Sequence, residues 1–234
     1  MTPPTVLVPG MLCDAGIWDG VRDGLGSGVV DVAITAGDVG AMAEQVLAAV
    51  PGPFNLVGLS LGAIVGFEVL RRAPERVVTL CAISTNAGAP RADQRESWLD
   101  MARSTTAGSF DAVVRERILP TMFAEFRPSP EQAEAFVDMA HRVGPAVFLR
   151  QLAAQATRRD QYAELARHRI PALVVGGGRD VLCPPEFHER LAGALPLAEL
   201  KVLPAAGHLL TWEAGGELAP LLRAHLHDHS PNPA

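Results

Sequence analysis

The sequence predicts an α/β protein with a doubly wound, mostly parallel sheet, and three observations point to this fold class. Short apolar runs alternate with longer segments of helical periodicity, over residues 1–89 and again over residues 169–234. Most of the short runs carry few polar residues, which is typical of parallel strands buried on both faces. Hydrophobic residues form 48% of the 234 residues, which is ample for one large α/β domain or two small ones.

Six strands and five helices make up the expected α/β core. The strands are residues 5–8, 29–34, 54–59, 76–83, 170–176 and 199–203. The helices are residues 17–25, 41–50, 61–72, 185–194 and 216–225. Strands that alternate with helices at this spacing form βαβ units, so we expect a parallel sheet with helices on both faces.

Residues 90–168 interrupt this alternation, because they contain no convincing strand. Amphipathic helices are expected there at residues 94–104, 110–123, 130–143 and 145–158. A structureless connection of this length is rare in a compact domain, so we expect a helical insertion before the last two strands of a single domain. Its charged residues are expected on solvated faces. They include Arg115, Glu116, Arg117, Arg158, Arg159 and Asp160.

Composition and charge exclude several classes of partner and location. A net charge of −6 and a pI near 5.6 argue against nucleic acid or an anionic membrane as the partner. No stretch approaches ~18 uninterrupted apolar residues, so no membrane span is expected. The N-terminus lacks the basic and apolar segments of a signal peptide, so a cytoplasmic location is expected. The odd number of cysteines, Cys13, Cys81 and Cys183, favours reduced thiols over a disulfide frame.

Residues 58–62, Gly-Leu-Ser-Leu-Gly, lie between an expected buried strand and an expected helix. A tight strand-to-helix turn strains the backbone of Ser60 and requires small residues two positions before and after it, which Gly58 and Gly62 provide. Such a turn lifts the Ser60 hydroxyl clear of the sheet and puts the Leu61 N–H at a helix N-terminus, where it can face an oxyanion. The motif also occurs by chance in glycine-rich proteins, so the rest of the sequence must show whether Ser60 is a nucleophile.

Two further residues supply that context. A serine hydroxyl needs a base to take its proton, and the base needs a carboxylate that holds its tautomer. Asp180 follows the strand at residues 170–176, and His208 follows the last strand. Because open α/β sheets keep their sites at the carboxyl ends of the strands, Ser60, Asp180 and His208 are expected to converge there.

Simpler roles remain possible for both residues. Asp180 could be only a turn and cap residue before Pro184. His208 could be a structural histidine. Of the other histidines, His141, His168 and His188 fall on helix faces and are expected in solvent, whereas His225, His227 and His229 form a cluster without a closed ligand set, so no metal is expected.

The order of the motifs, Gly-x-Ser-x-Gly at residues 58–62, then Asp180, then Gly207-His208, resembles the α/β-hydrolase family. The resemblance covers nearly the whole chain. It implies that residues 90–168 form a cap over an α/β core made of residues 1–89 and 169–234, and that the Met11 N–H is the second oxyanion donor beside Leu61. Many members have His-Gly where this chain has Pro9-Gly10, so its oxyanion hole must rely on backbone amides.

The expected activity is therefore that of a serine hydrolase without a cofactor. Its expected substrate is an ester, thioester or lactone of a small to medium, largely apolar acyl compound. A cofactor-free perhydrolase, a carbon–carbon bond hydrolase and a non-catalytic small-molecule binder remain alternatives, and the oligomeric state stays open between monomer and homodimer.

Apolar residues of the expected cap are numerous enough for some of them to line an acyl pocket. An unpaired charge is costly to bury, so charged acyl groups are expected to be poor substrates. The candidates for the pocket are Trp98, Met101, Phe123, Phe126, Phe136, Met139 and Phe148.

Overall fold

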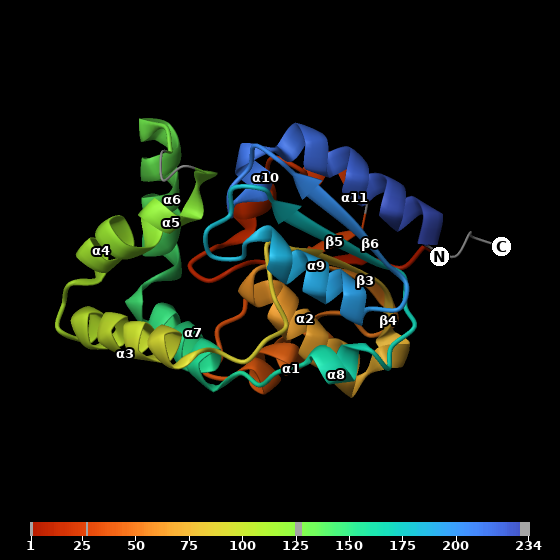
Figure 1. Cartoon of the computed structure of the whole chain (residues 1–234), viewed down its shortest axis with the longest axis horizontal. Coiled ribbons are helices and arrows are strands. Elements are labelled where there is room, and N and C mark those ends of the chain that lie inside the picture. Colours follow the sequence, from red (N-terminus) through yellow and green to blue (C-terminus); the bar gives the residue numbers. More distant parts are fainter. Residues whose placement is uncertain (1, 27, 125–127, 230–234) are drawn as a thin grey trace.

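The computed structural model describes residues 2–26, 28–124 and 128–229, and a six-stranded parallel sheet forms its centre (Figure 1). The strand order is β2-β1-β3-β4-β5-β6. The strands are β1 (Thr5–Val8), β2 (Val29–Asp31), β3 (Phe54–Leu59), β4 (Val77–Ile83), β5 (Ala172–Gly177) and β6 (Ala198–Leu203). Each lies where the sequence predicts a strand, so the predicted fold class is confirmed.

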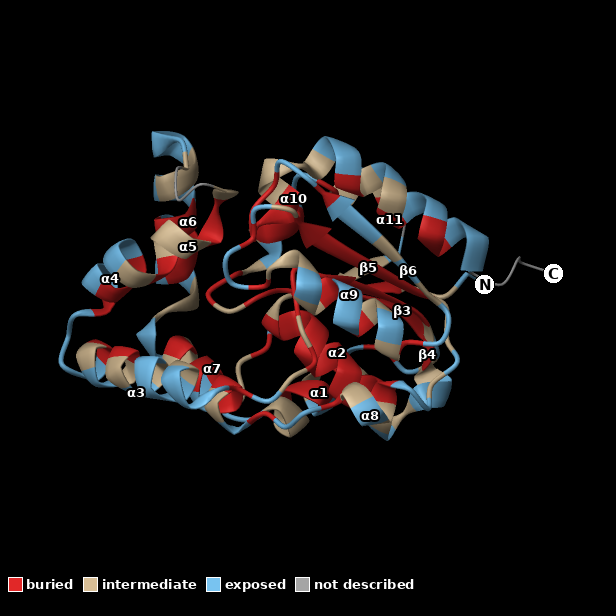
Figure 2. Ribbon diagram, viewed as in Figure 1, coloured by how far each residue is buried: buried red, intermediate tan, exposed pale blue. Residues whose placement is uncertain are grey.

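Helices cover both faces of the sheet, and the side chains of the strands alternate between two apolar cores. Leu7 of β1 packs into one core, whereas Val6 and Val8 pack into the other. The buried strands therefore lie between helices whose outer faces are exposed (Figure 2). The core on the Val6 side includes α1 (Val39–Ala49), α2 (Leu61–Arg72) and α9 (Pro185–Ala194), and the core on the Leu7 side includes α11 (Gly215–His229). Within the described ranges, no helix is both long and apolar enough to cross a membrane.

Between β4 and β5 the chain forms a helical insertion, which contains the elements α3 to α8. The carboxyl ends of the strands point toward its larger part, α3 to α7 (Figure 1). The predicted helix at residues 110–123 consists of two α-helical pieces joined by a π-helix, η4. The unpredicted α8 packs on α2 and α9 of the core. The helices are α3 (Ala92–Thr106), α4 (Phe110–Ala112), η4 (Val113–Ile118), α5 (Leu119–Met122), α6 (Pro130–Val143), α7 (Pro145–Thr157) and α8 (Tyr162–Leu165).

The helix predicted at residues 17–25 is wrong. That segment forms two 3-10 turns, η1 (Ala15–Trp18) and η2 (Arg22–Gly24). The backbone at Gly20 lies so close to the loop after β6 that a Cβ atom there would be 2.2 Å from the Thr211 carbonyl oxygen. Tertiary contact of the backbone therefore replaces a regular helix. The same loop contains a short helix that the sequence did not predict, α10 (Leu210–Glu213).

Candidate active site

Ser60 occupies a strained turn between β3 and α2. Its backbone has φ 53° and ψ −113°, outside the regions that residues with a side chain normally adopt. The two flanking glycines explain how the turn fits. A Cβ atom on Gly62 would lie 2.0 Å from the Val8 carbonyl oxygen, and one on Gly58 would lie 2.6 Å from Ala63 Cα. Only glycine allows this approach of the helix to the sheet.

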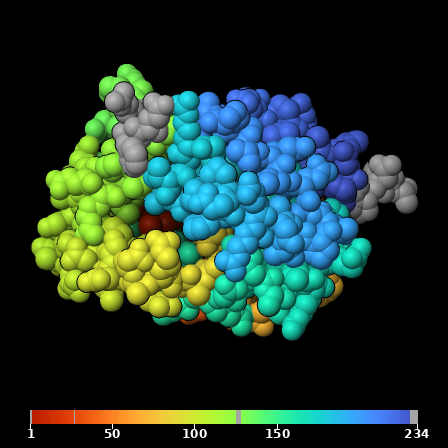
Figure 3. Space-filling model, in the orientation of Figure 1, coloured from red at the N-terminus to blue at the C-terminus, as the bar shows by residue number. Residues whose placement is uncertain are grey.

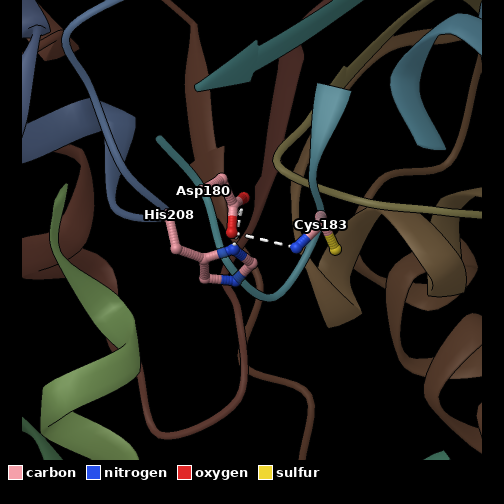
Figure 4. Close-up of side chains that lie close together, drawn as sticks. All are labelled: Asp180, Cys183 and His208. Carbon is pink, nitrogen blue, oxygen red and sulfur yellow. Dashed lines mark hydrogen bonds and ion pairs between the residues drawn. The ribbon is translucent and has the colours of Figure 1, made fainter. Parts of the chain in front are cut away.

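His208 connects Ser60 with Asp180. Nε2 of His208 lies 3.0 Å from the Ser60 hydroxyl, and Nδ1 lies 2.8 Å from Oδ2 of Asp180. His208 follows β6 and is 4% exposed, and Asp180 follows β5 and is 3% exposed. Figure 4 shows the ring of His208 directed at the Asp180 carboxylate. The structure thus brings together the three side chains that the sequence singled out.

The second oxygen of Asp180 also has partners. Oδ1 accepts hydrogen bonds of 2.9 Å from the N–H groups of Leu182 and Cys183. Burial by itself would raise the pKa of Asp180, but the charge and hydrogen bond of His208 and these two amides outweigh burial and lower it. The carboxylate is therefore held ionised. One of its oxygens holds the turn at residues 180–183, and the other orients the His208 ring.

Two backbone N–H groups near Ser60, those of Leu61 and Met11, have no hydrogen-bond acceptor within the described ranges. Leu61 is the first residue of α2, so its N–H has no acceptor within the helix. Met11 lies in the loop after β1, and no acceptor for its N–H is found within the described ranges. The adjacent Gly10 is close to Ser60, since a Cβ atom on Gly10 would lie 3.5 Å from Ser60 Cβ.

The same loop is attached to the insertion through one buried side chain. The Leu12 N–H donates a hydrogen bond of 3.0 Å to Oε1 of Gln151 in α7. Nε2 of Gln151 donates one of 3.1 Å to the Ile34 carbonyl. Gln151 therefore links the loop beside Ser60 with the loop after β2, and no sequence motif indicated it.

A cavity of about 680 Å³ opens above Ser60 and His208. Figure 3 shows a hollow between the yellow-green insertion and the cyan segment after β5, with red atoms of the N-terminal region at its floor. Of the apolar cap residues proposed for a pocket, Trp98 and Met101 line the cavity, together with Ile118 and Met122. Phe126 lies outside the described residues. The others are buried in the core and do not line the cavity: Phe123, Phe136, Met139 and Phe148.

Two charged residues of the insertion differ from the prediction of solvated faces. Arg158 is only 8% exposed, and Arg117 is partly buried and paired with Asp100 at 2.7 Å. Both line the cavity. Helical periodicity could not separate the outer face of the insertion from the face that roofs the cavity, because both carry charge.

His188 was expected in solvent, and this prediction is wrong. Its ring is fully buried between α9 and β5, where a Cβ atom on Gly176 would lie 2.4 Å from Nδ1. Nε2 of His188 accepts a hydrogen bond of 3.1 Å from the Thr85 N–H, and the Thr85 hydroxyl donates one of 3.0 Å to the Ser60 carbonyl. Burial lowers the pKa of His188 to about 4. This neutral histidine therefore supports the turn that carries Ser60.

The three C-terminal histidines do not form a group of metal-type ligands within the described ranges, although the rings of His225 and His229 are in contact, with centroids 4.7 Å apart. His225 is buried and its Nε2 lies 2.7 Å from the Thr79 hydroxyl, whereas His227 and His229 are exposed. The group of metal-type ligands found within the described ranges is Asp180, Cys183 and His208 (Figure 4). Burial and the charge of Asp180 raise the pKa of the Cys183 thiol to about 12. The ligand atoms of Asp180 and His208 are already hydrogen-bonded to each other.

The loop that carries His208 is joined to the insertion. Glu213 accepts hydrogen bonds from the Gly207 N–H at 3.0 Å and from the Ala124 N–H at 2.7 Å. The Leu209 N–H donates one of 3.0 Å to the Met122 carbonyl. Residues on both sides of His208 therefore hold the end of α5.

Comparisons with known proteins agree with this architecture. A family model described as alpha/beta hydrolase fold matches residues 33–215. The pimeloyl-[acyl-carrier protein] methyl ester esterase of Neisseria meningitidis serogroup C is 28% identical over 177 residues, which cover 73% of this chain and 68% of that protein.

Solved structures extend the likeness to nearly the whole chain. A thermophilic esterase from Thermogutta terrifontis, in a malate-bound structure, is 26% identical with a TM-score of 0.85, covering 98% of this chain and 91% of that one. The enol-lactonase from Burkholderia xenovorans LB400 has a TM-score of 0.86 at 19% identity, covering 97% of this chain and 92% of that one, a likeness of fold alone.

Proposed function

We propose, from the premise that this chain belongs to the alpha/beta hydrolase fold family, that Ser60, His208 and Asp180 are its catalytic triad. The chain is a carboxylic ester hydrolase, as the esterases among its relatives and structural neighbours indicate. The observation that carries the proposal is the continuous pair of hydrogen bonds from the Ser60 hydroxyl through His208 to Asp180, in a site that opens on a cavity.

In the first half of the reaction, Ser60 is the nucleophile. With the His208 proton on Nδ1 and bound to Asp180, the Ser60 hydroxyl donates its hydrogen bond to Nε2. As the Ser60 oxygen forms a bond to the carbonyl carbon of the ester, its proton passes to Nε2 and the carbonyl electron pair moves to the oxygen. The oxyanion electron pair then reforms the carbonyl, the bond to the alkoxy oxygen breaks, and that oxygen takes the proton from Nε2, which leaves an alcohol and an acyl-enzyme.

The oxyanion formed in this step needs donors that are already in place. We assign this role to the N–H groups of Leu61, which directly follows Ser60, and of Met11, which lines the same cavity; both lack acceptors within the described ranges. Fixed donors favour the transition state because they need no reorganisation as the charge develops. Gln151 supports the Met11 loop through its bond to Leu12.

In the second half, water replaces the alcohol. The water oxygen attacks the acyl carbon while His208 accepts a proton from the water. His208 then returns this proton to the Ser60 oxygen as the bond between that oxygen and the acyl carbon breaks and the acid is released. Asp180 stabilises the protonated ring in both halves. Burial of Asp180 and His208 strengthens this interaction, since the local dielectric is low.

The substrate class that this site favours is an ester, thioester or lactone of a small to medium, largely apolar acyl compound. The cavity volume suits a molecule of this size. Residues 90–168 act as the cap in this proposal, and Trp98, Met101, Ile118 and Met122 supply apolar lining from that segment. The core then consists of residues 1–89 and 169–234.

A fluorophosphonate probe tests the proposal directly, because it labels only an activated serine. Wild-type protein should be labelled at Ser60 and should cleave methyl and p-nitrophenyl esters. Ser60→Ala should lose both properties and keep its melting temperature, since α2 does not depend on the hydroxyl. Ser84→Ala is a matched control, because Ser84 also has a positive φ (48°) at the end of a strand but does not line the cavity. Hydrolysis by Ser60→Ala near the wild-type rate would refute the assignment.

A further inference from the structure

Arg158 follows the last residue of α7 and lines the same cavity as Ser60 and His208. Only 8% of the residue is exposed. A short chain of contacts leads from it toward the candidate triad: its guanidinium lies 3.5 Å from Oδ1 of Asn86, and Nδ2 of Asn86 lies 3.7 Å from the Cys183 sulfur, beside Asp180.

The acceptors around this guanidinium are all neutral. Nε donates to the Gly88 carbonyl at 3.0 Å, and the terminal nitrogens donate to the side-chain oxygens of Gln155 and Asn86. The ring of Trp98 lies against it, 5.6 Å from the guanidinium carbon. No carboxylate within the described ranges forms an ion pair with Arg158.

Other arginines around the cavity are neutralised. Arg91 pairs with Asp93 at 2.9 Å, and Arg117 pairs with Asp100. The next residue in the chain, Arg159, is half exposed and pairs with Glu68 at 2.7 Å. Arg158 is thus both more buried and less compensated than the arginines beside it.

A buried guanidinium without a counter-ion has a physical cost. Arginine does not lose its proton in proteins, so it cannot relieve this cost by becoming neutral. Burial lowers the pKa of Arg158, which means that its charged form is disfavoured where it lies. Its five N–H donors meet three described acceptors. An anion in the cavity would accept the remaining hydrogen bonds and neutralise the charge of the guanidinium.

The acidic residues that line the cavity do not supply this charge. Asp93 is bound to Arg91, and Glu186 forms no ion pair within the described ranges and belongs to the first turn of α9. The cavity therefore offers apolar surface from the insertion and one buried, uncompensated cation.

We propose that Arg158 binds a carboxylate carried by the substrate at a distance from the scissile ester. This inference rests on the proposed function and narrows its substrate class to esters or lactones with an apolar chain and one distal carboxylate. It modifies the expectation that charged acyl groups are poor substrates, because a carboxylate that reaches Arg158 is not an unpaired charge.

The test compares charged and neutral esters of equal length. Monomethyl esters of dicarboxylic acids of about five to eight carbons carry the carboxylate on the acyl side, and methyl esters of the matching monocarboxylic acids are the neutral partners. A butyrate ester of a hydroxy acid, against an alkyl butyrate, puts the carboxylate on the alcohol side. The variants are Arg158→Gln, Arg158→Lys and, as the matched control, Arg159→Gln.

For each ester series we compare the kcat/KM of the charged ester with that of its neutral partner. We expect this ratio to fall about 10- to 100-fold in Arg158→Gln, either in the series with the carboxylate on the acyl side or in the series with it on the alcohol side. Arg158→Lys should fall less, because it keeps the charge but loses the planar fork. Arg159→Gln should keep the wild-type ratio. An unchanged ratio in Arg158→Gln, or an equal loss for charged and neutral esters, overturns the inference.

A binding measurement keeps the inference testable if Arg158→Gln does not fold. Titration calorimetry of wild-type protein with a dicarboxylate and with the corresponding neutral diamide should give a Kd at least about tenfold lower for the dicarboxylate. Equal affinities overturn the inference. Turnover by Ser60→Ala would instead refute the proposed function, and the calorimetric result does not depend on turnover.

Discussion

Gln151 of α7 accepts a hydrogen bond of 3.0 Å from the N–H of Leu12, which lies 139 positions earlier in the chain. Leu12 has a positive φ of 62° and directly follows the proposed oxyanion donor Met11. A conformation of this kind persists only where surrounding contacts enforce it. The insertion therefore contributes to the geometry of the loop beside Ser60 as well as to the roof of the cavity.

Gln151→Leu should lower kcat by about tenfold or more with little change in KM, because the oxyanion donor acts mainly in the transition state. It should also lower the free energy of unfolding by roughly 1–3 kcal/mol for each buried partner left unpaired. Gln161→Leu is the control, since Gln161 is equally buried but contacts the Ile64 carbonyl. Steady-state kinetics well below the melting temperature provide the check. A kcat for Gln151→Leu within twofold of Gln161→Leu would contradict the role.

Asp180→Asn should reduce kcat by as much as ~10⁴, because an amide favours the wrong tautomer of His208. The fold should survive, since the amide oxygen can still accept hydrogen bonds from Leu182 and Cys183. Asp160→Asn is the control, because the Asp160 carboxylate is exposed and accepts a hydrogen bond from the Tyr162 N–H. This variant should keep wild-type kinetics. A decrease in kcat of less than tenfold in Asp180→Asn would mean that another residue is the acid of the triad.

The cavity lining should set the preference for acyl length. Each methylene buried in the cavity stabilises the bound transition state by about 0.8 kcal/mol, so kcat/KM should rise up to a maximum at roughly two to eight carbons. Met101→Ala should move this maximum toward longer chains, because Met101 lines the cavity.

Met139→Ala is the matched control for this series, because Met139 is buried in the core and does not line the cavity. It should lower stability by about 2–5 kcal/mol and leave the length profile unchanged. A series of p-nitrophenyl esters measures the profile, and identical profiles for wild type and Met101→Ala would exclude Met101 from the acyl pocket.

Stability should fall between pH 6.5 and pH 4. Burial lowers the pKa values of His188 and His225 from 6.5 to about 4 in the folded state. In that window the unfolded chain binds more protons than the folded chain, so acid favours unfolding. Each histidine can contribute up to about 3 kcal/mol to this loss.

Urea unfolding at pH 7 and pH 5 measures this dependence, and His188→Gln should reduce it. Glu68, whose pKa three arginines lower to about 2 despite its burial, adds a loss only below pH 4.5. A stability that is constant from pH 7 to pH 4.5 would mean that neither histidine is buried in its neutral form.

Local signals made much of this protein predictable from its sequence. The turn at Ser60 depends on glycines two residues away, so its motif and its geometry coincide. Asp180 and His208 follow strand ends, and the parallel sheet brings strand ends together. The residues that were misjudged depend on contacts between distant segments. His188 is buried because Gly176 leaves room for its ring. Arg158 is buried because Asn86, Gly88 and Trp98 from distant parts of the chain pack around it.

Two hydrogen bonds join the segment of His208 to the end of α5, and a third holds Gly207 to Glu213, which gives this contact a mechanical consequence. If α5 moved outward with these hydrogen bonds intact, it would pull on Gly207 and Leu209 and draw the His208 imidazole away from Ser60. Under the proposed function, a substrate that enters through the existing opening of the cavity leaves the proposed triad assembled. Access and proton transfer would then be linked, because an outward movement of α5 that widens the opening also displaces the proposed base.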